Sequence, residues 1–137
     1  MSISEVITIA KAAGFQGVGV PVAVAIAMAE SSLNQNAVGD VYLQTVKWGP
    51  SVGLWQIRSL KPAYLHLEPI RNYSNLFDPA YNAKAAFAIS KGGTDFSPWS
   101  TYLDKKYLKY LDAVKQAAPA AAGSLVIIAA IIYFLTR

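Results

Sequence analysis

A glutamate at the end of an apolar helix is the residue best suited to catalysis in this sequence. Residues 17–30 read GVGVPVAVAIAMAE, so Glu30 closes a predominantly apolar stretch. A carboxyl group half-buried at such a helix end loses solvation of its charged form, which raises its pKa and keeps it protonated near neutral pH. A protonated carboxyl of this kind can act as a general acid on the leaving oxygen of a glycosidic bond. A solvent-exposed glutamate without a catalytic role is the simpler alternative, and position alone does not separate the two.

The composition excludes several other kinds of active site. The chain has no cysteine, so neither a thiolate nucleophile nor a disulfide framework is possible. Its single histidine, His66, cannot form a zinc site by itself. Gly17 and Gly19 lack the third glycine and the preceding strand of a phosphate-binding loop. We therefore expect no metal and no cofactor.

Three sequence motifs occur in an order that matches a known superfamily. Residues 29–39 read AESSLNQNAVG, residues 51–57 read SVGLWQI, and residues 76–86 read LFDPAYNAKAA. Together they resemble the three motifs of the soluble lytic transglycosylase and goose-type lysozyme superfamily, over about residues 18–103. Residues 96–102, FSPWSTY, are similar to the Trp-x-x-Tyr ending of phage-type members. The chain departs from the larger soluble enzymes because it lacks an Ala-Tyr-Asn-Ala-Gly motif after the third one.

The resemblance implies a lysozyme-like α+β fold, predominantly α-helical, with a small β-hairpin beside a saccharide cleft. It implies an enzyme that cleaves the β-1,4 bond between N-acetylmuramic acid and N-acetylglucosamine in peptidoglycan, with Glu30 as the catalytic acid. Further residues of the motifs are implied to bind substrate or, for some of them, to support Glu30: Ser31, Gln56, Asn82, Trp99 and Tyr102.

The supply of carboxylates bears on the reaction. Hydrolysis of a glycosidic bond usually employs two carboxylates. Glu5 and Asp78 are predicted to cap helices, and of the remaining acids only Asp40, in the loop after the first motif, can readily approach the cleft. A lytic transglycosylase needs a single acid, because the muramyl 6-hydroxyl attacks its own anomeric carbon in place of water. We therefore favour the non-hydrolytic reaction, with a hydrolytic muramidase that uses Asp40 as the alternative.

Capping patterns predict the helices that must position Glu30. Ser2 and Glu5 have the spacing of a capping box, which predicts a first helix that stops at Gly14. Residues 17–30 predict a buried second helix with Pro21 at its first position. This helix is too short to cross a bilayer, so we expect it to form the core.

The remaining elements follow from strand and turn signals. Residues 41–47 and 53–57 are predicted to pair as a β-hairpin around a turn at residues 49–51, with a partly irregular loop as the alternative. The Asp-Pro pair at residues 78–79 predicts the start of a helix. Residues 97–118 are predicted to form one last helix, whose aromatic stripe is best explained by core packing.

The C-terminal segment predicts a membrane anchor. The stretch from Ala120 to Leu135 contains no charged residue. Counted from Ala117 it spans about 28 Å as a helix, close to the roughly 30 Å of a bilayer's hydrocarbon core. We therefore divide the chain into a lysozyme-like transglycosylase domain, residues 1–118, and a single transmembrane anchor, residues 119–137.

The predicted anchor bears on where the enzyme would be located. Four lysines precede the segment and only Arg137 follows it, so the positive-inside rule would leave the domain in the cytoplasm, away from peptidoglycan. A phage virion with an internal membrane removes this conflict. The sequence thus predicts a virion-associated lytic enzyme for phage entry, with other virion membrane proteins as candidate partners, or else an enzyme of the bacterial envelope.

The net charge of +4 favours an anionic partner. No nucleic-acid motif accompanies it, so we expect peptidoglycan and membrane as partners and no nucleic acid. Two other classes of protein remain as alternatives. One is a membrane-anchored wall-binding structural protein without turnover, and the other is a holin-like pore, against which a single span with no polar face argues.

Overall fold

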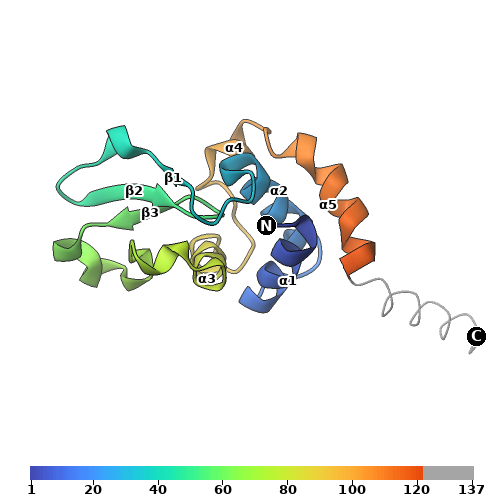
Figure 1. Ribbon diagram of the computed structural model, residues 1–137, viewed down its shortest axis with the longest axis horizontal. Helices are drawn as coiled ribbons and strands as arrows, with labels where there is room; N and C mark the ends of the chain where they lie inside the picture. The colour runs from blue at the N-terminus through green and yellow to red at the C-terminus, as the bar shows by residue number, and fades with distance from the viewer. Residues whose placement is uncertain (122–137) are drawn as a thin grey trace, which may run out of the picture.

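The computed structural model describes residues 1–121 of the chain. This part consists of helices on one side and a small antiparallel sheet on the other (Figure 1). The α-helices are α1 (Ile3–Ala13), α2 (Gly19–Ser31), α3 (Pro79–Ile89), α4 (Ser100–Leu103) and α5 (Leu108–Ala121). The strands, which lie in the order β1-β2-β3, are β1 (Val38–Gly39), β2 (Trp48–Val52) and β3 (Ile57–Leu60). Short 3₁₀ helices are η1 (Val41–Leu43), η2 (Pro62–Leu67), η3 (Pro69–Arg71) and η4 (Asn75–Phe77). The fold is mostly helical α+β, as the sequence predicted.

The first helix begins and ends as predicted. The Ser2 hydroxyl accepts a hydrogen bond from the Glu5 backbone N–H (3.1 Å), and the Glu5 carboxylate accepts one from the Ser2 N–H (3.0 Å). This confirms the capping box, which pairs two N–H groups that the helix itself cannot satisfy. Gly14 ends the helix with a φ of 123°, a backbone conformation that favours glycine.

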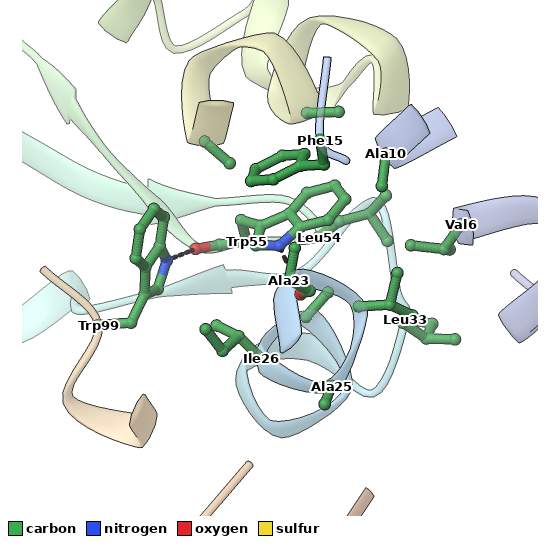
Figure 2. Packing of buried hydrophobic residues seen from close by; sticks show 14 of the residues in the cluster. Val6, Ala10, Phe15, Ala23, Ala25, Ile26, Leu33, Leu54, Trp55 and Trp99 are labelled. Carbon is green, nitrogen blue, oxygen red and sulfur yellow. Dashed lines mark hydrogen bonds between the residues drawn. The ribbon is translucent and has the colours of Figure 1, made fainter. Parts of the chain in front are cut away.

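Helix α2 is the centre of the core and carries Glu30 in its last turn. Its residues Ala23 to Ala27 are fully buried, and Figure 2 shows Ala23, Ala25 and Ile26 within the core. Helices α1 and α5 pack against it (Figure 1). The prediction of a buried core helix is therefore confirmed. The helix begins at Gly19, so Pro21 is its third residue and not, as predicted, its first. The position is tolerated because the N–H groups of the first turn have no partner within the helix.

The predicted hairpin exists, but its strands are displaced along the sequence. Residues 41–47 form η1 and a loop, and the predicted turn at 49–51 lies inside β2. The chain reverses instead at residues 53–56, where Gly53 has a φ of 81° that favours glycine. A register shift between Trp48 and Ser51 accommodates proline inside β2, because strand irregularities tolerate a missing N–H.

The two last predicted helices have different outcomes. Helix α3 begins as predicted, with Pro79 in its first turn and the Asp78 carboxylate accepting a hydrogen bond from the Tyr81 N–H at 3.0 Å. The single helix predicted over residues 97–118 is instead two helices, α4 and α5. Between them Lys105 has a φ of 63°, which no right-handed helix accommodates.

The predicted transmembrane helix is corrected. Within residues 1–121 no helix has the length and apolarity to span a bilayer. Helix α5, the last described, has 14 residues and measures about 21 Å, against roughly 30 Å of hydrocarbon, and it carries Lys109, Asp112 and Lys115. The described residues therefore do not support the predicted membrane helix, the single-pass anchor or the membrane localisation. Residues 122–137, which hold most of the predicted span, lie outside the described residues.

Candidate functional site

Glu30 lies in a pocket of about 220 Å³ between the helices and the sheet. We call it the Glu30 pocket. Four of the predicted residues line it: Glu30, Asp40, Gln56 and Trp99. A larger hollow of about 530 Å³ lies beside β2, β3 and η2, but no carboxylate lines it. Because acid catalysis of glycoside cleavage requires a carboxyl group, the chemistry places the candidate active site at the smaller pocket.

The pKa of Glu30 is raised above its ordinary value, chiefly because burial disfavours the charged carboxylate. The hydrogen bond from Thr101 opposes this shift by stabilising the charge. The negative charges of Asp40 and Asp104 add to it, while Lys106 works against it. The net direction favours a protonated carboxyl, which is the form that a general acid needs.

Thr101 holds the Glu30 side chain in place. Its hydroxyl donates a hydrogen bond of 2.7 Å to the Glu30 carboxylate, joining residues 71 positions apart in the chain. Thr101 lies in α4, within the segment 96–102 that supplied the Trp-x-x-Tyr resemblance. The contact fixes one carboxylate oxygen of Glu30 against α4.

Asp40 brings a second carboxylate to the same pocket. It follows β1 directly, with a φ of 56°, and accepts a hydrogen bond from the Ser51 hydroxyl on the neighbouring strand β2. Its charge is one of the causes that raise the pKa of Glu30. The structure thus brings together the two acids that the sequence analysis singled out.

Gln56 lines the pocket, but its amide nitrogen is engaged by the backbone. It donates to the carbonyl oxygens of Ala37 (3.1 Å) and Gly53 (3.0 Å), which ties the β2–β3 turn to the segment before β1. A Cβ atom at Gly39 would lie 2.4 Å from the Gln56 side-chain oxygen. Because Gly39 has no side chain, the Gln56 side chain can pack closely against the backbone of β1.

Ser31 and Asn82 lie outside the pocket lining and support the turn beneath it. The Ser31 hydroxyl donates to the carbonyl of Leu54 at 2.8 Å. Asn82 is fully buried. Its amide donates to the carbonyls of Val52 (2.8 Å) and Leu76 (2.9 Å), and its oxygen accepts from the Trp55 N–H at 2.9 Å. Asn82, which belongs to α3, therefore stabilises the β2–β3 turn and has no exposed surface that could contact a glycan.

Trp99 and Tyr102 occupy different surroundings. The Trp99 indole N–H donates to the Trp55 carbonyl at 2.8 Å, and the Trp55 indole N–H donates to the Ala23 carbonyl of α2 at 2.8 Å (Figure 2). This relay fixes the Trp99 ring at the pocket edge. Tyr102 does not line the pocket and stacks on Tyr107, with ring centroids 5.0 Å apart.

Three residues of the site were not predicted from the sequence: Thr101 and the pocket-lining Arg58 and Arg71. Arg58 directly follows the second motif, so its position next to the cleft strand was a usable signal. Thr101 lies between Trp99 and Tyr102, which were both assigned to the cleft. A hydroxyl group at that position was a weaker signal. Arg71 belongs to no motif, and only the fold brings it to the site.

The comparisons with known proteins agree with the geometry. Residues 7–101 match the family described as a lysozyme-like domain. Neither the curated proteins nor the solved structures gave a significant match. The matched region contains α2, the sheet and α3, and it ends at Thr101, so it includes the whole lining of the Glu30 pocket. It supports the predicted relation to the lytic transglycosylase and lysozyme superfamily and suggests an enzyme that degrades peptidoglycan. The chain therefore belongs to the lysozyme-like domain family.

Proposed function

We propose that the chain cleaves the β-1,4 bond between N-acetylmuramic acid and N-acetylglucosamine in peptidoglycan, with Glu30 as the general acid. The observation that carries the proposal is the partly buried Glu30 carboxyl, whose pKa is raised within a pocket of a lysozyme-like domain. Because its pKa is raised, this carboxyl keeps its proton to higher pH than an ordinary glutamic acid does, and the protonated form can protonate the leaving oxygen.

The first candidate reaction is non-hydrolytic. Glu30 donates its proton to the glycosidic oxygen while the bond from that oxygen to the muramyl C1 breaks. The muramyl C6 oxygen then bonds to C1, and its proton passes to the Glu30 carboxylate, which restores the acid. No water is consumed, and the product is a 1,6-anhydromuramyl end. One carboxyl group suffices, and Thr101 supports it by holding one of its oxygens.

The second candidate is hydrolysis, and the position of Asp40 favours it. Asp40 and Glu30 line the same pocket, which meets the first requirement of a two-carboxylate glycosidase. In this route Asp40 stabilises the positive charge that develops at C1 or activates a water molecule. The product is a reducing muramyl end, heavier than the anhydro product by one water molecule.

Two variants of the full chain test the proposal on purified peptidoglycan, and the second of them separates the two reactions. We expect Glu30→Gln to lower the cleavage rate at least about a hundredfold, as the loss of a general acid does. Asp40→Asn should leave most activity if the reaction is non-hydrolytic and remove it if the reaction is hydrolytic. Mass spectrometry of the fragments identifies the anhydro or reducing ends directly. Wild-type protein that binds peptidoglycan but releases no fragments contradicts an enzymatic function and favours a wall-binding one.

The pocket residues suggest how a glycan is held. Trp99 is only 5% exposed, so it forms a fixed part of the pocket wall and not an open stacking surface, and Gln56 supports the turn that forms the opposite wall. The expected role in phage entry depended on the membrane anchor, so the proposal does not extend to it.

A further inference from the structure

The Glu30 pocket has a cationic wall that general-acid catalysis does not need. Arg58 of β3 and Arg71 of η3 line the pocket together with the two carboxylates. A neutral sugar chain gives no reason to place guanidinium groups there. Guanidinium groups recognise carboxylates and phosphates through paired hydrogen bonds.

Both arginines are held in place by the β-sheet side of the molecule. Arg58 donates through Nε to the carbonyl of Gly49 and through Nη2 to the carbonyl of Leu43. Arg71 donates through Nε to the Glu68 carboxylate at 2.5 Å and through Nη1 to the Arg58 carbonyl at 3.0 Å. Within residues 1–121 no acceptor is bonded to Nη1 of Arg58 or Nη2 of Arg71. Each guanidinium is therefore fixed on one side and has a terminal nitrogen left for a ligand.

Three cationic side chains, including both arginines, lie close to the indole ring of Trp48. Lys47 lies 5.3 Å from the ring centroid, Arg58 6.0 Å and Arg71 5.3 Å, all within the range of a cation–π contact. Glu68 supplies the one carboxylate paired with this group among the described residues, so three positive charges and one negative charge leave a net of +2. Asp40 lines the same pocket but forms no ion pair with Arg58 among the described residues, and its carboxylate accepts from the Ser51 hydroxyl.

We propose that Arg58 and Arg71 form an anion subsite that binds a carboxylate of the stem peptide on the muramyl residue being cleaved. In peptidoglycan the two sugars are uncharged once the lactyl group is amide-linked to the peptide, so the negative charge of the substrate lies on the stem peptides. The inference rests on the proposed function and narrows its substrate to peptide-bearing glycan strands. The subsite fixes the strand in the cleft by its charged branch, beside the acid that protonates the bond.

The test compares three substrates prepared from one batch of peptidoglycan. The first is intact, the second has its carboxyl groups converted to neutral amides by carbodiimide coupling with ammonia, and the third has been stripped of stem peptides by an amidase, which leaves a free lactyl carboxylate. We expect kcat/KM of the full chain to fall about tenfold from the intact to the amidated substrate, the size of one charge-assisted contact. Arg71→Gln and Arg58→Gln should lose about tenfold on intact peptidoglycan and little on the amidated form, with Arg58→Lys between.

The outcomes separate this proposal from the proposed function. Equal losses on intact and amidated substrates overturn the subsite, because they show that the arginines only maintain the sheet. An arginine effect that persists on stripped glycan overturns the stem-peptide assignment in favour of the lactyl carboxylate. Lys11→Gln removes an exposed charge from α1 and should change neither rate.

Co-sedimentation with insoluble peptidoglycan tests the subsite without turnover. In the Glu30→Gln background, we expect the full chain to bind intact peptidoglycan about tenfold more tightly than the amidated form, and Arg71→Gln to remove this preference. A preference for intact peptidoglycan supports the subsite even if no protein variant cleaves, which would contradict only the proposed function. Equal binding to both forms rejects the subsite.

Discussion

The pKa of Glu30 depends chiefly on two opposing effects of its surroundings. Burial raises its pKa, and the Thr101 hydroxyl lowers it by donating to the charged form. A general acid works best when its pKa lies near the operating pH, so the balance between these influences sets the useful pH range. Thr101 also restrains the carboxyl in one orientation, and its removal affects both properties.

We expect Thr101→Val to move the alkaline limb of the kcat/KM profile to higher pH. The hydrogen bond favours the charged carboxylate, so its loss raises the pKa of Glu30 and keeps the acid protonated further. The rate at the optimum should fall about tenfold, because the carboxyl is less well oriented. A pH–rate series on soluble peptidoglycan fragments measures both effects. Thr101→Ser keeps the hydroxyl and should retain the wild-type limb, and an unshifted limb in Thr101→Val contradicts the role.

Single residues differ in how far the sequence reveals them. The capping box at Ser2 and Glu5 and the cap at Asp78 were predictable, because each bond joins residues three positions apart. Glu30 was predictable from its apolar helix and its motif. Its contact with Thr101 spans 71 positions, and no local pattern encodes such a pairing.

At the scale of elements, the β2–β3 turn beneath the pocket depends on one side chain from α3. Asn82 binds the backbone of Val52, Trp55 and Leu76, so one buried amide joins the sheet, the turn and η4. Gly53 fits against it because a Cβ there would lie 2.4 Å from the Asn82 amide nitrogen. Asn82 therefore acts on the site by positioning the turn.

Asn82→Ala should lower the free energy of unfolding by about 3 kcal/mol or more, because it leaves buried backbone groups without partners. Urea unfolding followed by circular dichroism measures the change. Asn75→Ala, an exposed position in η4, is the matched control and should stay within about 0.5 kcal/mol of the wild type. Similar values for the two variants would contradict the structural role of Asn82.

The displaced hairpin and the divided last helix show where sequence patterns stop being informative. Residues 41–47 have the composition of a strand, yet tertiary pairing selects 48–52 as the partner of β1 and β3. The break at Lys105 likewise carries no proline or glycine signal, because it arises where α4 turns Thr101 toward Glu30 and α5 packs on α2. Both misplacements come from packing between distant segments.

For the molecule as a whole, the raised pKa of Glu30 links folding to pH. A carboxyl whose pKa is higher in the folded state stabilises the fold fully below its unfolded pKa and loses that contribution as pH rises through the folded value. Ionisation of Glu30 at high pH therefore lowers the stability of the folded domain relative to its stability at low pH. Such a loss of stability is expected where function requires a buried acid.

Glu30→Gln should therefore raise the melting temperature at pH 7 relative to wild type, and the difference should shrink as the pH is lowered through the carboxyl range. The lowered pKa values of Glu5 and Asp95 contribute to the pH dependence of both proteins and cancel in the comparison. Differential scanning calorimetry of both proteins from pH 3 to pH 8 measures the effect. A difference independent of pH would mean that packing, not charge, accounts for it.

The tryptophan relay gives this domain a built-in optical reporter. The three tryptophans occupy three distinct settings. Trp55 lies in the dry core and Trp99 lines the Glu30 pocket (Figure 2), while Trp48 lies beside the arginines. A glycan that fills the pocket changes the polar surroundings of Trp99, which lines it, and leaves the buried Trp55 untouched. A charged branch seated on the arginines alters the field at Trp48. Emission spectra of single Trp→Phe variants can thus follow the sugar chain and its peptide separately, with no added label.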